Sequence, residues 1–84
     1  MEIKLNIKQF EYVNSQLSNE REDLSQHFIG SKQNDKVIIK LEEGVADEIR
    51  DWAGEKLQKV GFDKEYNLTE EGRILEVLVD LLYK

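Results

Sequence analysis

The apolar positions of this chain follow two different periods, and these periods predict its secondary structure. Between residues 7 and 17, "IKQFEYVNSQL", apolar residues recur at three- and four-residue spacing, which predicts a helix that begins after Asn6. Asn6 can cap this helix, and Gln9 is placed to complete a capping box. A short leading strand over residues 2–5 is an alternative, and both can occur in succession. The polar stretch 18–23, "SNERED", is expected to be a loop.

A β-hairpin is expected next. Residues 25–32 and 36–43 flank the tripeptide "QND", whose Asn and Asp suit a tight turn. Alternate residues of the second strand are apolar and share one face. Ile38 points to the opposite, polar face, so either that face is partly covered or Ile38 is exposed. We favour partial cover, because a bare two-stranded ribbon is only marginally stable.

Two further helices are predicted in the second half. In "GVADEIRDWAGEKLQKVG", residues 44–61, the apolar side chains gather in one arc that includes Trp52, which is expected in the core. Gly61 suits the left-handed position past the end of this helix. After a loop over residues 62–68, Thr69 can cap a last helix that runs to the end of the chain. Little of that helix is polar, so it is either central to the domain or partly buried by another molecule.

These elements give the order α-β-β-α-α, an α+β arrangement in which an antiparallel hairpin packs against helices. A chain of 84 residues predicts one small domain spanning residues 1–84. Without cysteine it has neither disulfides nor a zinc-binding cysteine motif to support the core. No signal-peptide pattern and no apolar run of membrane-spanning length are visible, so a cytoplasmic protein is expected.

Charge narrows the choice of partner. The net charge is -6, with 18 acidic and 12 basic residues, and the acidic excess lies mostly in the second half. Such a chain repels nucleic acid and anionic membranes and favours basic proteins. We therefore expect no direct contact with nucleic acid and none with a membrane.

One row of like charges stands out on the predicted helix over residues 44–61. Asp47, Asp51 and Glu55 follow one another at four-residue spacing, with Glu48 beside them. Like charges at this spacing repel by roughly 0.2–0.5 kcal/mol per pair. The row is therefore either solvated surface or a contact site for a basic partner.

Neighbouring residues bear on both interpretations. Pairing of Asp47 with Arg50 and of Glu55 with Lys59 would make the row an ordinary solvated face. Gly54, beside the row, points to a contact site, because a glycine inside a helix costs about 1 kcal/mol relative to alanine. A bare backbone at that position would let a partner approach closely.

Two other clusters contain the residue types of catalytic or metal sites. Asp23, Ser25 and His27 are the residue types of a hydrolytic triad. On a strand, however, residues two apart are separated by about 6–7 Å, whereas proton transfer needs contacts of about 2.6–3.2 Å. The segment 63–74 alternates oxygen-bearing side chains like a calcium loop, but it lacks the required glycine at its sixth position and glutamate at its twelfth. We expect no enzyme, no metal and no cofactor.

The sequence thus predicts a small acidic protein-binding module. It would act as an inhibitor, a nucleic-acid mimic that occupies the basic surface of a nucleic-acid-handling protein such as a nuclease. Bacterial toxin-neutralising proteins and phage anti-defence proteins have this size and sign of charge, which is an analogy and not a family match. The binding residues would be Asp47, Glu48, Asp51 and Glu55.

The alternative is a homo-oligomeric assembly module. It would use the apolar C-terminal helix, with Val77, Leu81 and Tyr83 in excess of what one domain covers, or the hairpin edge near Ile38. Symmetric dimers are the commonest oligomers. The two hypotheses are compatible, because a homodimer can still carry two acidic faces.

Overall fold

A computed structural model describes residues 1–83 of the chain. They form β1 (Glu2–Asn6), α1 (Ile7–Glu20), α2 (Glu22–Ser25), β2 (Gly30–Gln33), β3 (Lys36–Lys40), α3 (Glu43–Val60) and α4 (Glu70–Leu82). The predicted α+β class and the antiparallel hairpin are confirmed. Contacts within the chain divide it into two compact units, Met1–Ala46 and the residues from Asp47 onward, and each unit is described by itself. One domain over residues 1–84 stays a prediction.

The first unit is built on a three-stranded antiparallel sheet of order β1-β3-β2. The leading strand that the sequence offered as an alternative is therefore real, and it precedes the first helix. It pairs with β3 from Glu2 opposite Lys40 to Asn6 opposite Lys36. Pairing continues past the strand ends, where the amino terminus of Met1 donates to the Leu41 carbonyl at 2.9 Å. This third strand supports a hairpin that would be only marginally stable alone.

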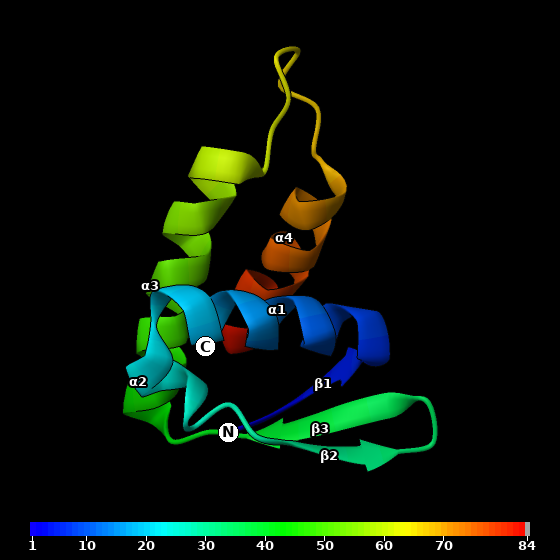
Figure 1. Ribbon diagram of the computed structural model, residues 1–84, viewed down its shortest axis with the longest axis vertical. Helices are drawn as coiled ribbons and strands as arrows, with labels where there is room; N and C mark the ends of the chain where they lie inside the picture. Colours follow the sequence, from blue (N-terminus) through cyan, green and yellow to red (C-terminus); the bar gives the residue numbers. More distant parts are fainter. Residues whose placement is uncertain (84) are drawn as a thin grey trace. The chain divides into compact units, whose positions relative to one another are not determined.

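One face of this sheet is buried and carries α1 along it (Figure 1). Alternate side chains of the two longer strands point into that face and are at most 6% exposed: Ile3, Leu5, Val37 and Ile39. The predicted capping box starts α1. Asn6 Oδ1 accepts from the Gln9 amide at 2.7 Å, and Gln9 Oε1 accepts from the Asn6 amide at 2.9 Å. These bonds satisfy amide donors that have no partner inside the helix.

The prediction of a loop over residues 18–23 is wrong, because these residues are mostly helical. α1 continues to Glu20, and α2 follows from Glu22. Leu24 of α2 is buried, and its amide donates to the Arg21 carbonyl at 3.0 Å. Polar residues in this stretch occupy the outer side of helical turns, and composition alone does not distinguish such turns from a loop.

The first strand of the hairpin is shorter than predicted, because regular pairing begins only at Gly30. Phe28, just before it, is 1% exposed and stacks on Phe10 of α1 with ring centroids 5.4 Å apart. A Cβ on Gly30 would clash with Val37 and lie 2.8 Å from Phe10 Cε1. Phe10, which carries this stack, therefore lies directly against the start of β2. The turn itself is as predicted, with Asn34 in the left-handed region at φ 57°.

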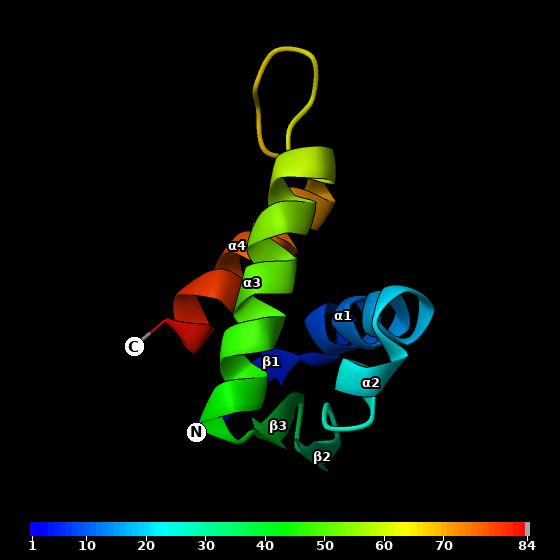
Figure 2. The same cartoon turned by 90° about the vertical axis from the view of Figure 1, so that its left-hand side faces the viewer.

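In the second unit, α3 from Asp47 onward and α4 lie side by side and antiparallel (Figures 1 and 2). Trp52 is 8% exposed, so its predicted burial is confirmed. The other buried side chains of this unit are Ile49, Ala53, Ile74, Leu75, Leu78 and Leu82.

Thr69 closes the base of the connection between these helices. Its hydroxyl donates to the Val60 carbonyl at 3.0 Å and accepts from the Gly72 amide at 3.0 Å, and its own amide donates to the Gly61 carbonyl at 2.8 Å. The predicted cap is confirmed. The left-handed conformation predicted for Gly61 is wrong, because no glycine among residues 1–83 has positive φ. Glycine is needed at that position because a Cβ would clash with the Leu57 carbonyl oxygen.

The loop between the helices is ordered by one carboxylate. Asp63 Oδ1 accepts from the amides of Glu65 at 2.8 Å and Asn67 at 3.0 Å. At the tip, Tyr66 adopts φ 65° and is 86% exposed. One oxygen of the calcium-like pattern, Asp63 Oδ1, therefore accepts hydrogen bonds from the loop's own backbone.

Candidate protein-binding surface

The acidic residues singled out in the sequence lie on one side of α3. We call Asp47, Glu48, Asp51 and Glu55 the acidic face. The helix runs unbroken through all four, so their spacing places them on adjacent turns. Of the two carboxylates beside Arg50, Asp51 is the more open, with 74% of its side chain exposed against 42% for Asp47.

Arg50 is the cation inside this face. Its guanidinium lies 3.5 Å from Asp47 Oδ1 and 3.7 Å from Asp51 Oδ1, and it sits 6.0 Å from the ring centroid of Tyr83. The expected pairing of Asp47 with Arg50 is therefore present. An exposed ion pair contributes only about 0–1 kcal/mol. The same guanidinium thus serves both carboxylates, and Asp51 is the more weakly held of the two.

Glu55 is not neutralised. It is exposed, and no basic side chain among residues 1–83 forms an ion pair with it, including Lys59 one turn later. The pairing that would have made the row an ordinary solvated face is thus only half realised. The end of the acidic face nearer Glu55 keeps its full charge.

A shallow hollow of about 470 Å³ adjoins the acidic face. It is lined by Arg50, Asp51, Gly54, Glu55, Gln58, Val79 and Tyr83. A Cβ built on Gly54 would meet no atom within 4 Å, so packing within the chain does not require glycine there. The helix therefore exposes bare backbone beside two carboxylates, where a partner's side chain can approach closely.

Sequence reasoning missed the contribution of α4 to this surface. Val79 and Tyr83 line the hollow opposite α3, and Tyr83 is 72% exposed. The pattern placed Tyr83 only among residues available for self-assembly. No sequence signal joins it to Arg50, because that contact depends on how two helices far apart along the chain pack.

The triad-like cluster is not brought together. Asp23 lies on α2 and is held by Arg21, whose guanidinium donates to the carboxylate at 2.9 and 3.1 Å. This hydrogen bond keeps the pKa of the Asp23 carboxyl below its usual value. Ser25 donates instead to the Glu22 carbonyl at 2.8 Å, and His27 is exposed after the helix ends. Among these described residues, no hydrogen-bond relay links the three.

Comparison of the chain with protein families, with curated protein sequences and with solved structures finds no match. Among the helices that the structure describes, none has the length and apolar character needed to span a bilayer. Within the same residues, no three acidic or histidine side chains are grouped so that they could hold a metal ion.

Proposed function

We propose that this chain is a small acidic protein-binding module that occupies the basic surface of another protein. Its target would be a nucleic-acid-handling protein, which it inhibits by placing carboxylates where phosphates would bind. The observation that carries the proposal is the charge left at one end of the acidic face: Glu55 has no ion pair among the described residues, and Asp51, 74% exposed, shares its guanidinium with Asp47.

The electrostatics of α3 support this function. Three acids on consecutive turns repel one another, which costs folding stability unless a partner's positive charges relieve the repulsion. A field of one sign also speeds association with a target of the opposite sign. Both effects weaken with salt, because at about 0.1 M ionic strength charges are screened beyond about 10 Å.

Gly54 supports it independently. Alanine in its place would fit and would be expected to stabilise the helix by about 0.5–1 kcal/mol. Stability is often sacrificed at binding surfaces. A glycine that no neighbour requires, beside the hollow, is therefore typical of a site that receives another molecule.

The test begins with capture of a partner by the immobilised chain. We expect a basic protein to be retained at low salt and released at high salt, and the same protein, once purified, to bind the chain directly. Charge reversal by Asp51→Lys with Glu55→Lys should weaken that binding at least tenfold, because it places like charges against the partner's cations. Titration calorimetry of the purified pair measures the change in Kd.

The matched control reverses two exposed acids elsewhere, Glu11→Lys with Asp35→Lys, which changes net charge equally. If this control weakens binding as much as the α3 variant, net charge and not the acidic face governs recognition. If the α3 variant binds normally, the acidic face is not the site. Inhibition is measured separately, as release of the target from a labelled nucleic acid when the chain is added.

Gly54→Ala provides a further prediction for the same complex. The variant should unfold at higher denaturant concentration than the parent chain, yet bind the partner less tightly, because the new methyl group fills the point of closest approach. Equal binding by parent and variant would mean that the hollow takes no part in the contact.

A further inference from the structure

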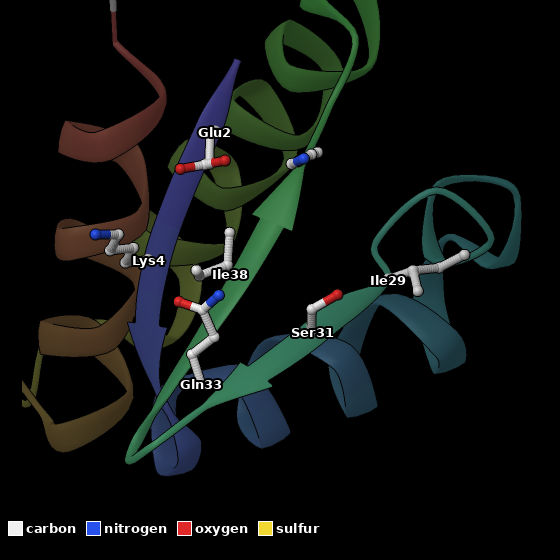
Figure 3. Close-up of a pocket in the computed structure, with 7 residues that line it drawn as sticks. Glu2, Lys4, Ile29, Ser31, Gln33 and Ile38 are labelled. Carbon is white, nitrogen blue, oxygen red and sulfur yellow. The ribbon is translucent and has the colours of Figure 1, made fainter.

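The sheet of the first unit has a second face, which no helix within residues 1–46 covers. Its side chains come from all three strands, and Figure 3 shows Ile38 of β3 lying between Lys4 of β1 and Ser31 of β2. A hollow of about 490 Å³ opens on this face. It is lined by Glu2, Lys4, Ile29, Ser31, Gln33, Ile38 and Lys40.

This open face is positively charged, although the whole chain is acidic. Lys4, Lys36 and Lys40 project from it and are exposed, and Glu2 is the one carboxylate among its paired strand residues. None of these three lysines forms an ion pair with any residue from 1 to 83, and Glu2 does not pair with Lys40 opposite it in the register. Local positive charge is thus left without an internal partner.

The same face has an apolar centre. Ile38 is half-buried between its cross-strand neighbours Lys4 and Ser31, so within residues 1–46 the only cover on this side comes from the sheet's own side chains. Ile29, directly before β2, is 71% exposed and lines the same hollow. The face therefore fits a surface that offers apolar side chains next to carboxylates.

The outer side of α4 offers that combination. Val77 and Leu81 lie one turn apart and are 37% and 39% exposed. Glu76 and Asp80 precede them by one residue each, also one turn apart and exposed, while Arg73 adds one positive charge. Carboxylates and apolar side chains therefore run in two adjacent rows along this helix.

We propose that the open sheet face of one copy docks against the outer side of α4 of a second copy. Lys4 and Lys40 pair with Glu76 and Asp80, and Ile38 with Ile29 packs on Val77 and Leu81. The contact joins two different surfaces, so it is heterologous, and repetition gives rings or open chains.

Spacing on the two surfaces agrees. Lys4 and Lys40 are diagonal neighbours across β1 and β3, a relation that places side chains about 7–8 Å apart. Carboxylates one helical turn apart lie about 5–6 Å from each other. The flexible lysine side chains easily span this difference, so both ion pairs can form at once.

Nucleic acid is a poorer occupant of the sheet face. Proteins that bind single strands on a sheet stack bases on aromatic side chains, and the open face of these strands carries none. The outer side of α4 needs no aromatic stacking, and its exposed apolar side chains match the apolar centre of the sheet face.

The first test is the mass of the chain in solution, measured by light scattering after gel filtration and by sedimentation equilibrium. At about 0.05 M salt, where charges are weakly screened, we expect the average mass to rise with protein concentration above the 9.9 kDa of one copy. At high salt it should fall back toward one copy. If the mass stays at one copy at every concentration up to about 1 mM, any Kd for the contact is weaker than about 1 mM. That result overturns the proposal.

The decisive test exchanges the charges. Lys4→Glu with Lys40→Glu should weaken self-association at least tenfold, and so should Glu76→Lys with Asp80→Lys. Mixing the two variants should restore association, because the reversed sheet of one then meets the reversed helix of the other. If the mixture stays as dissociated as its components, these surfaces do not meet.

Two controls separate docking from net charge and from misfolding. Lys59→Glu with Lys64→Glu changes the net charge as the sheet variant does but leaves both surfaces intact, so it should associate normally. Lys4→Gln with Lys40→Gln removes the positive charges without adding repulsion and should also weaken association. Circular dichroism of each variant confirms that it is folded.

Chemical cross-linking identifies the contact directly. A carbodiimide joins a lysine to a carboxylate without a spacer, so mixed light and heavy isotope-labelled chains should yield inter-copy products linking Lys4 or Lys40 to Glu76 or Asp80. Inter-copy products confined to other residues would contradict the proposed contact even if the chain self-associates.

Discussion

Phe28→Ala is expected to lower the free energy of unfolding by about 3–5 kcal/mol, the usual cost of truncating a buried phenylalanine. The side chain is 1% exposed and lies 5.4 Å, centroid to centroid, from Phe10 in a stacked pair. Its removal leaves a cavity between α1 and the start of β2 and deprives Phe10 of its partner. Urea denaturation followed by far-UV circular dichroism measures the change. A chain of this size is stable by only about 4–12 kcal/mol, so the loss is a large share of the total.

Phe62→Ala is the matched control. The same side chain is removed, but Phe62 is 44% exposed, so the expected loss is about 1 kcal/mol or less. Equal losses in the two variants would mean that the Phe10–Phe28 stack does not contribute more than a half-exposed ring. Phe28→Leu, which keeps most of the volume, should lie between the two.

Gly72→Ala is expected to cost about 1–3 kcal/mol, although alanine favours helices. Gly72 occupies the first turn of α4, where a Cβ would collide with the carbonyl oxygen of Gly61 and lie 2.8 Å from its Cα. Both obstacles are backbone atoms and have no rotamer with which to move aside. The Thr69 hydrogen bonds at the same junction would be stretched as the helices separate. Denaturant unfolding followed by the fluorescence of Trp52 reports on this unit.

Gly54→Ala should have the opposite effect on stability from Gly72→Ala. Both glycines lie in helices of the same unit, yet a Cβ added at Gly54 would meet open space, so this variant should be more stable than the parent. Loss of stability in both variants would show that Gly54 is required by the fold, and it would remove one argument for the binding surface.

The helices that the sequence predicted well are those in which local signals agree. At Asn6 a capping residue, its partner Gln9 and a helical apolar period coincide, and α1 begins there. Thr69 likewise starts α4. In these places neighbours along the chain make the deciding hydrogen bonds, so no distant contact is needed to predict them.

The errors fall where packing, and not a local sequence pattern, decides the backbone. Residues 18–23 carry no apolar period, and their helical turns are continuous with elements that bury Leu17 and Leu24. A glycine past a helix end predicts a left-handed backbone at Gly61, but the structure requires glycine there because a Cβ would clash with the Leu57 carbonyl oxygen. Residues 25–29 were predicted as strand, whereas stacking on Phe10 places Phe28 in the connection before β2.

For the candidate surface, the amino-acid order alone determined that Asp47, Asp51 and Glu55 share one side of a helix, because residues four apart in a helix lie on the same side. Only the tertiary structure decided that Tyr83 reaches Arg50, that Glu55 stays without a counter-ion among the described residues, and that Gly54 opens onto a hollow. The reason is range: helical periodicity and capping depend on atoms a few residues apart, whereas a hollow and its charge balance depend on which side chains packing brings together from distant parts of the chain.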